Sequence, residues 1–163
     1  MIEEQVNIQN AFHLAGIIPI AGQPMDFNFP WHDSCMPIAP DYLAVERAVV
    51  ECAYAGCETI WIVCHDDVQP LIRHRIGEII EDPVWLGRNM DPRPSETRKQ
   101  IPIYYVPIHP KHRDRVDNYA WSAIYGANVC FWVMRMFSRW TVPTAYYVSF
   151  PLGMHDPKEL LKH

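Results

Sequence analysis

Residues 59–64 of the chain, Thr-Ile-Trp-Ile-Val-Cys, form a run with no charged side chain and no alternation of polar and apolar residues. A strand with one face in water alternates apolar and polar residues, whereas a strand buried on both faces is apolar throughout. Strands of the second kind are typical of parallel sheets that helices cover on both sides. This segment therefore favours an α/β architecture with at least one central strand.

Strand patterns alternate with helical patterns along the whole chain, in the order β-α-β-α-β-α-β. This order predicts a three-layer α/β/α fold with a mostly parallel sheet and right-handed crossovers. A length of 163 residues fits a single domain of this kind. We expect strands at residues 15–22, 59–64, 101–106 and 144–150, and helices at residues 42–55, after residue 66 and at residues 114–137.

Capping residues predict where the first two helices begin and end. Asp41 is expected to cap the first helix and Gly56 to end it. Either Asp66 or Asp67 is expected to cap the second helix. Helical spacing predicts that the inner faces are Val45, Ala48, Val49 and Cys52 in the first helix, and Leu71, Ile72, Ile76 and Ile79 in the second.

Residues 23–40 show neither helical nor strand periodicity and contain four prolines, which predicts a long rigid loop. Long loops inside compact domains are usually functional. In this loop Trp31 precedes the titratable residues His32 and Asp33. An aromatic side chain beside a titratable pair is suited to bind a sugar or a base.

Charge and composition exclude several classes of protein. With 14 Lys and Arg against 19 Asp and Glu, the formal net charge is −5, which argues against a dedicated nucleic-acid-binding protein. No apolar run approaches the roughly 20 residues of a membrane-spanning helix, and the first ten residues lack the positive cluster of a secretory signal. The five cysteines include no C-x-x-C pair, so neither a disulfide framework nor a zinc ribbon is predicted. We expect a cytoplasmic protein.

The carboxyl ends of the expected strands are the predicted place for a site, because ligands of open α/β sheets bind there. Each end also has a purely structural interpretation. Asp66 fits a helix cap as well as a ligand contact, and His109 fits a loop residue. His155 and Asp156 fit either a metal or substrate contact or a turn before a proline. The polar segments in question are residues 21–22, 64–67, 107–110 and 151–156.

Between residues 16 and 63 the chain reads G-I-I-P-I-A-G, a proline-rich loop, M-P-I, a helix ending in A-G-C, and the strand T-I-W-I-V. This order resembles the nucleotide-binding half of the sugar-1-phosphate nucleotidyltransferases. In that family an A-G-x-G-x-R loop, a K-P-x-L-P-I element and a helix ending in A-G precede the second strand. The chain is also similar to nucleotidyltransferase-like proteins of tailed phages of marine cyanobacteria, which implies the host cytoplasm.

The resemblance implies a Rossmann-like (GT-A-like) fold and the transfer of a nucleotide from a nucleoside triphosphate to a sugar phosphate. It also implies Mg²⁺ as the cofactor, because a metal ion spreads the charge of the leaving pyrophosphate. The implied nucleotide contacts are Ala21, Gly22, Gln23 and Asp66, the implied phosphate and catalytic residues are Lys111 and Arg113, and the implied metal ligand and catalytic carboxylate is Asp156.

Three positions depart from the family pattern. Pro24 stands at the second glycine of the loop, Asp26 at its arginine and Asp33 at the lysine of the next element. Proline has no N–H to donate, and a carboxylate repels phosphate. Family members also continue beyond this length to build a sugar pocket. Two interpretations stay open: a nucleotidyltransferase with an altered loop, or a non-catalytic protein that keeps the fold for binding or assembly.

The predicted helix at residues 114–137 is rich in aromatic side chains. Trp121, Tyr125 and Trp132 do not all share one helix face with the small residues, so part of this apolar surface is expected to be exposed. Large exposed apolar surfaces mark interfaces. We therefore expect a homo-oligomer or a protein that docks into a larger assembly.

Overall fold

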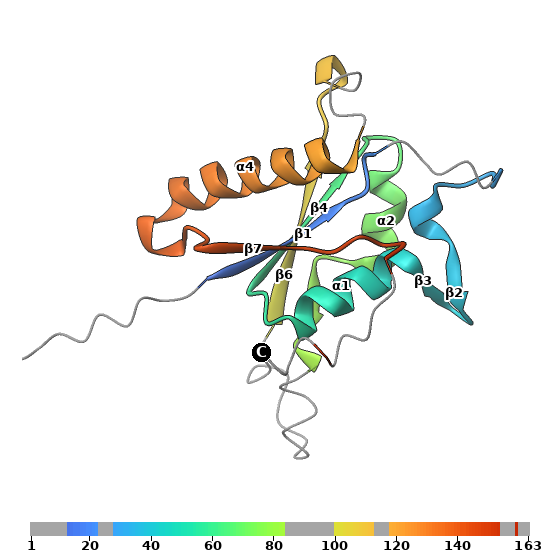
Figure 1. The fold of residues 1–163 in the computed structure, drawn as a ribbon, viewed down its shortest axis with the longest axis horizontal. Coiled ribbons are helices and arrows are strands. Elements are labelled where there is room, and N and C mark those ends of the chain that lie inside the picture. Colours follow the sequence, from blue (N-terminus) through green and yellow to red (C-terminus); the bar gives the residue numbers. More distant parts are fainter. Residues whose placement is uncertain (1–12, 23–27, 84–99, 113–117, 154–158, 160–163) are drawn as a thin grey trace, which may run out of the picture.

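The protein is a mixed α/β domain built on a mostly parallel five-stranded sheet (Figure 1). The computed structural model describes residues 13–22, 28–83, 100–112, 118–153 and 159. The strand order is β5-β6-β4-β1-β7, and every neighbouring pair is parallel except β5 with β6. The strands are β1 (Leu14–Pro19), β4 (Thr59–Cys64), β5 (Ile79–Glu81), β6 (Gln100–Pro107) and β7 (Ala145–Val148).

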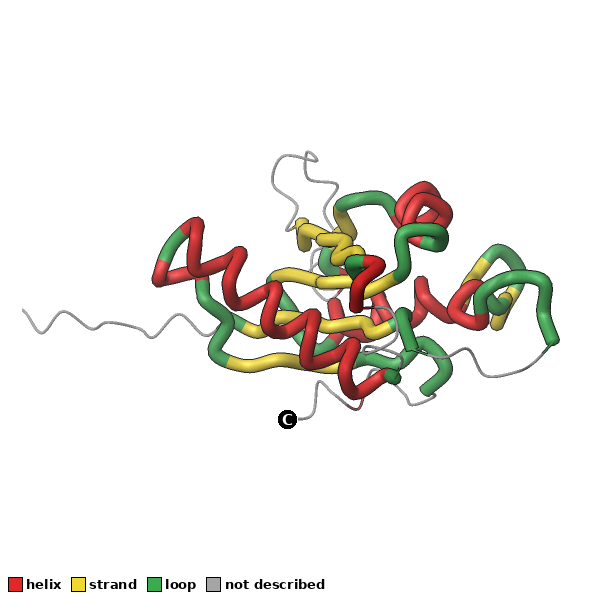
Figure 2. Tube along the Cα trace, turned by 90° about the horizontal axis from the view of Figure 1, so that it is seen from above, coloured by secondary structure: helices red, strands yellow, loops and turns green. Residues whose placement is uncertain are grey.

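Helices cover both faces of the sheet, as the sequence predicts. Helices α1 (Ala44–Tyr54) and α2 (Gln69–Ile76) pack on one face, and α4 (Tyr119–Phe137) packs on the other against β1 and β4. Figure 2 shows the long helix α4 running across the strands. The central strand β4 is buried at all six positions, which explains its uninterrupted apolar sequence.

The start of α1 differs from the prediction. Asp41 does not cap the helix: it lies in a turn with φ 56° between the short antiparallel strands β2 (Pro37–Ala39) and β3 (Tyr42–Leu43). Aspartate tolerates this left-handed conformation better than most residues. The helix begins at Ala44, and Glu46 Oε2 accepts the N–H of Leu43 at 2.7 Å. The expected long loop is therefore interrupted by β2 and by the 3₁₀ helix η1 (Asp33–Cys35).

The other end of α1 is as predicted. Gly56 has φ 83°, a left-handed conformation that ends helices and that glycine adopts without strain. The predicted inner face of α1 is buried at all four positions, Val45, Ala48, Val49 and Cys52.

Helix α2 is shorter than predicted and begins later. Its N-cap is Val68, so Asp66 and Asp67 precede the helix without capping it. Ile72 is buried, but Leu71 is 56% exposed, and Ile79 belongs to β5 rather than to the helix. The β5 strand was not predicted, because three residues are too few to show a period.

Helix α4 begins at Tyr119, where the Asn118 side chain accepts the N–H of Trp121 at 2.8 Å. The predicted start at residue 114 falls in residues 113–117, outside the described part. A stripe at four-residue spacing faces the sheet: Ser122, Gly126, Cys130 and Met134. No helix among the described residues is both long enough and apolar enough to cross a membrane.

Candidate functional site

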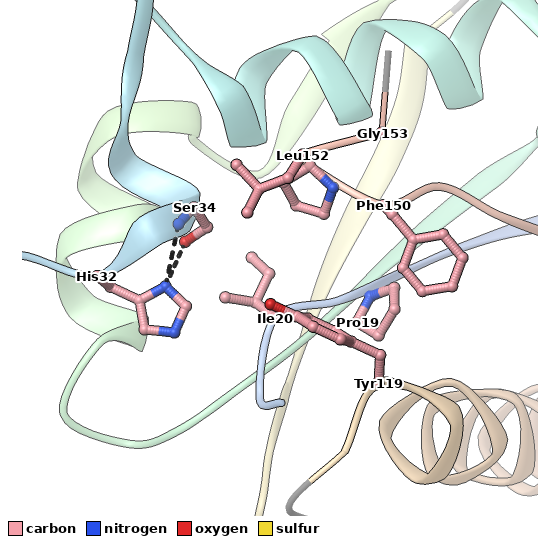
Figure 3. A pocket seen from close by; sticks show the side chains of 9 residues that line it. Pro19, Ile20, His32, Ser34, Tyr119, Phe150, Leu152 and Gly153 are labelled. Atoms are coloured by element: carbon pink, nitrogen blue, oxygen red, sulfur yellow. Dashed lines mark hydrogen bonds between the residues drawn. The ribbon is translucent and has the colours of Figure 1, made fainter. Parts of the chain in front are cut away.

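A pocket of about 330 Å³ opens at the carboxyl ends of β1 and β7 (Figure 3). Its walls come from four parts of the chain: the end of β1, the η1 turn, the first residue of α4 and the segment after β7. The lining residues are Pro19, Ile20, His32, Ser34, Tyr119, Phe150, Pro151, Leu152 and Gly153.

The position of this pocket follows from the chain path. After β1 the chain passes through α1 on one face of the sheet to reach β4, whereas α4 leads into β7 from the opposite face. The strand order also reverses at β1, because β4 and β6 lie on one side of it and β7 on the other, and such a reversal leaves a crevice beyond the carboxyl ends. Ligands of doubly wound sheets bind at this switch point.

The walls of the pocket are mostly apolar. The rings of Tyr119 and Phe150 meet edge to face, with centroids 6.1 Å apart and planes at 90°. Gly22 lies against the Tyr119 ring, and a Cβ at Gly22 would come within 2.9 Å of ring carbon Cδ1. The glycine after β1 thus lets the first aromatic residue of α4 approach the end of the strand.

The polar side chains that line the pocket are His32, Ser34 and, through its hydroxyl, Tyr119. His32 Nδ1 lies 2.7 Å from Ser34 Oγ and also accepts the backbone N–H of Ser34 at 3.2 Å (Figure 3). Because a backbone N–H can only donate, Nδ1 carries no proton, and the Ser34 hydroxyl donates to it. The proton of the neutral ring is therefore on Nε2.

The environment of His32 favours the neutral ring. Burial lowers the pKa of His32 below its usual value of 6.5, and the nearby His65 lowers it further. The carboxylates of Asp33 and Asp67, and a hydrogen bond with the backbone of Ile20, act in the opposite direction without reversing the shift.

This lowered pKa predicts a loss of stability in mild acid. Below the usual value of 6.5 the unfolded state binds a proton at His32 that the folded state does not, so the free energy of unfolding falls as the pH falls. The variant His32→Asn keeps a side-chain acceptor for the N–H of Ser34 but does not titrate. We expect it to lose less stability than the wild type in urea unfolding between pH 7 and pH 5. His74→Asn, on the exposed side of α2, serves as the control and should follow the wild type.

Asp33 is buried, with 4% of its surface exposed, although the sequence places it in a loop. Among the described residues its Oδ2 atom has no hydrogen-bond partner, and its charge contributes to raising the pKa of Tyr119, after the larger effect of burial. A lysine at this position would have to enter a buried site, so Asp33→Asn is the better probe of the charge.

The predicted nucleotide contacts at the end of β1 are only partly available. Ala21 and Gly22 are buried, and the N–H groups of Ile20 and Ala21 both donate to the carbonyl of Val63, at 2.8 and 3.1 Å. The Ala21 amide is therefore engaged within the sheet and is not free to bind a phosphate.

Of the other predicted residues, His32 and residues 151–153 line the pocket, whereas Asp66, Lys111 and Trp31 do not. Asp66 is exposed just after β4, and Lys111 is exposed in the 3₁₀ helix η3 (Pro110–His112) that follows β6. Trp31 is 48% exposed and stacks on Phe29. The remaining residues singled out in the sequence lie outside the described residues: Gln23, Pro24, Asp26, Arg113, His155 and Asp156.

Within the described ranges, no three or more His, Cys, Asp or Glu side chains lie close enough together to hold a metal ion. In nucleotide sites Mg²⁺ is usually bound by one or two carboxylates together with phosphate oxygens. The unpaired Oδ2 of buried Asp33 is an oxygen ligand of this kind.

The sequence predicted a site at residues 151–156, of which Pro151, Leu152 and Gly153 line the pocket, but it did not predict the aromatic residues Tyr119 and Phe150. Tyr119 was expected inside a helix rather than at its start, and Phe150 within a strand rather than after it. The available signal was Asn118, a strong N-cap residue directly before the aromatic residue.

Comparison with protein-family models, with characterised proteins and with solved structures finds no match to this chain.

Proposed function

We propose that the pocket between β1 and β7 binds the base and sugar of a nucleotide, in a Rossmann-like domain of the nucleotidyltransferase type. The observation that carries the proposal is the position of the pocket at the switch point of a parallel sheet. The aromatic rings of Tyr119 and Phe150 and the few polar groups suit an uncharged ring system. The motif resemblance between residues 16 and 63 supports the same class of ligand.

The phosphates of such a ligand would lie at an edge of the sheet that carries negative charge and offers few free N–H donors. Asp33 is buried beside the pocket, Asp66 and Asp67 follow β4, and the Ala21 N–H is occupied. Carboxylates repel phosphate unless a cation lies between them. Bound Mg²⁺, with Asp33 or Asp66 among its ligands, would neutralise the phosphate charge. We expect transfer to a sugar phosphate to be weak or absent, because Asp26 and Asp33 stand where the family has cations.

The test is isothermal titration calorimetry of the folded chain against nucleosides and nucleoside triphosphates, with and without Mg²⁺. We expect at least one nucleoside to bind without metal, and its triphosphate to bind only when Mg²⁺ is present. Asp33→Asn should reduce the Mg²⁺ requirement. Absence of heat with every nucleoside, from a sample with a cooperative unfolding transition, would contradict the proposal.

A variant that fills the pocket tests whether the nucleoside binds there. Leu152 lines the pocket, so Leu152→Trp is expected to weaken nucleoside binding at least tenfold by occupying the space. The matched control is Leu71→Trp, which adds the same indole on an exposed position of α2. Equal affinity in both variants would place the ligand elsewhere.

A second candidate role, self-association, is favoured by the outer surface of α4. Trp121, Ile124 and Trp132 lie on one stripe of the helix and are 54%, 59% and 55% exposed. Met136, Phe137 and Trp140 extend this apolar surface at its C-terminal end. The one charged residue on the described stripe, Arg135, lies over the rings of Phe131 and Trp132. We propose that this nearly uncharged surface packs against the same surface of a second copy.

Sedimentation velocity over a range of concentrations tests this association. We expect a dimer that Ile124→Glu converts to a monomer, because the dimer would bury two carboxylates in a nearly uncharged surface. The control is Leu71→Glu on α2, which should leave the dimer intact. A wild-type monomer at every concentration would overturn this role and leave the nucleoside proposal unaffected.

A further inference from the structure

Ser34 and His32 have the arrangement of an activated nucleophile and its base. Ser34 Oγ donates to His32 Nδ1 at 2.7 Å, and both side chains line the pocket. His32 Nδ1 also accepts the backbone N–H of Ser34 at 3.2 Å, which holds the ring beside the hydroxyl. A nucleophile within hydrogen-bond reach of a base is the usual signature of covalent catalysis.

We propose that Ser34 is a nucleophile that accepts the acyl group of a small, uncharged ester bound in this pocket, with His32 as its general base. The cap of η1 needs only the contact between the Ser34 N–H and His32 Nδ1. The hydroxyl contact is additional to the cap and directs the oxygen and its proton acceptor toward one cavity.

The step balances with the ester and water as reactants. Ser34 Oγ forms a bond to the carbonyl carbon while its proton moves to His32 Nδ1, and the ester C–O bond breaks. The leaving alcohol takes the proton from Nδ1. Water then attacks the acyl-serine, gives a proton to Nδ1 and releases the carboxylic acid, and Ser34 Oγ recovers its proton. His32 Nδ1 already accepts the Ser34 hydroxyl at 2.7 Å, so it is placed for the first transfer.

The surroundings define the class of substrate. The pocket of about 330 Å³ is lined mostly by apolar groups, including Ile20 and Leu152, and suits a short acyl or aryl group. The negative charges of Asp33 and Asp67 act on His32, so an anionic group at the same place would be repelled. An uncharged ester is therefore favoured over a phosphate or a dicarboxylic half-ester.

The test uses the full chain with an uncharged alkyl fluorophosphonate and with 4-nitrophenyl butyrate. We expect a single adduct that peptide mapping places on Ser34, and hydrolysis of the butyrate ester. The 4-nitrophenyl half-ester of glutaric acid, which adds a charge, should react at least tenfold more slowly. Ser34→Ala should abolish labelling, and His32→Asn, which keeps the cap acceptor, should slow hydrolysis by about 100-fold.

Ser138→Ala is the matched control, because Ser138 also caps a 3₁₀ helix, accepting the N–H of Trp140 at 3.2 Å. It should label and hydrolyse like the wild type. An adduct on another residue, no adduct on a folded wild-type sample, or equal hydrolysis by Ser34→Ala would overturn the proposal. The inference does not depend on nucleoside binding: a failed titration leaves the labelling result standing, and a failed labelling leaves the titration standing.

Discussion

Replacing Arg47 with methionine is expected to lower the free energy of unfolding by about 3 kcal/mol, because it leaves a buried carboxylate without its charged partner. Arg47 Nη1 donates to Glu51 Oε2 at 2.6 Å, and Glu51 is only 1% exposed. The hydroxyl of Tyr147, on β7, donates to the other oxygen of Glu51 at 2.7 Å. Burial and this hydrogen bond with Glu51 raise the pKa of Tyr147 above its usual value, so the phenol remains a donor.

The same arginine also holds the wall of the pocket. Arg47 Nη2 donates to the carbonyls of Phe150 and Pro151, at 2.8 and 3.3 Å, and thus ties the segment after β7 to α1. Arg47→Met should therefore weaken any ligand of the pocket in addition to its effect on stability. Urea unfolding and the nucleoside titration measure the two effects.

A double variant separates the charge from the contacts with the wall. In Arg47→Met with Glu51→Gln, the buried charge is gone and the amide oxygen still accepts from Tyr147. We expect this variant to be more stable than Arg47→Met alone, while ligand affinity stays low. If the double variant is as unstable as the single one, the buried charge is not the cause of the loss.

Gly126→Ala is expected to destabilise the protein by about 2 kcal/mol, even though alanine favours helices by roughly 1 kcal/mol over glycine. A Cβ at Gly126 would lie 2.5 Å from Val63 Cγ2 and 3.1 Å from Ile17 Cγ2. Both neighbours are fully buried side chains of the central strands β1 and β4, so the helix would have to move away from the sheet.

Thermal unfolding checks this expectation. Asn128→Ala is the control: it also places alanine in the middle of α4, but on the exposed side, and should change stability by less than about 0.5 kcal/mol. The combination of Gly126→Ala with Val63→Ala makes room for the new methyl group. If Gly126→Ala proved as stable as the wild type, α4 would not pack on the sheet at this distance.

The sequence predicts the elements of the fold well where a local pattern is long. Thr59–Cys64 is found as predicted because a run apolar on both faces has few alternatives, and α1 ends at Gly56 because glycine adopts φ 83° without strain. The errors lie where two local preferences compete. Asp41 is a good cap and also a good turn residue, and the pairing of β2 with β3 places it in the turn.

The sequence predicted the edge of the sheet at which the candidate site lies, but not all of the residues that line it. The carboxyl edge of the sheet follows from strand order, and Gly22 was expected there. The contribution of Tyr119 to the pocket was not predicted. Its position at the end of β1 depends on where α4 begins and on Gly22, about a hundred residues earlier in the chain. Asp33 is a second case: the sequence places it in a loop and leaves its exposure open, and packing against the domain buries it.

The sequence alone therefore determined the alternation of strands and helices, the central place of β4 and the inner face of α1, because each follows from the period of neighbouring side chains. The tertiary structure decided the strand order β5-β6-β4-β1-β7, the face on which each helix packs and the meeting of His32, Ser34, Tyr119 and Phe150 around one cavity. Those features depend on the direction of each crossover and on contacts between distant segments, and hydrophobic periodicity within a segment carries no information about either.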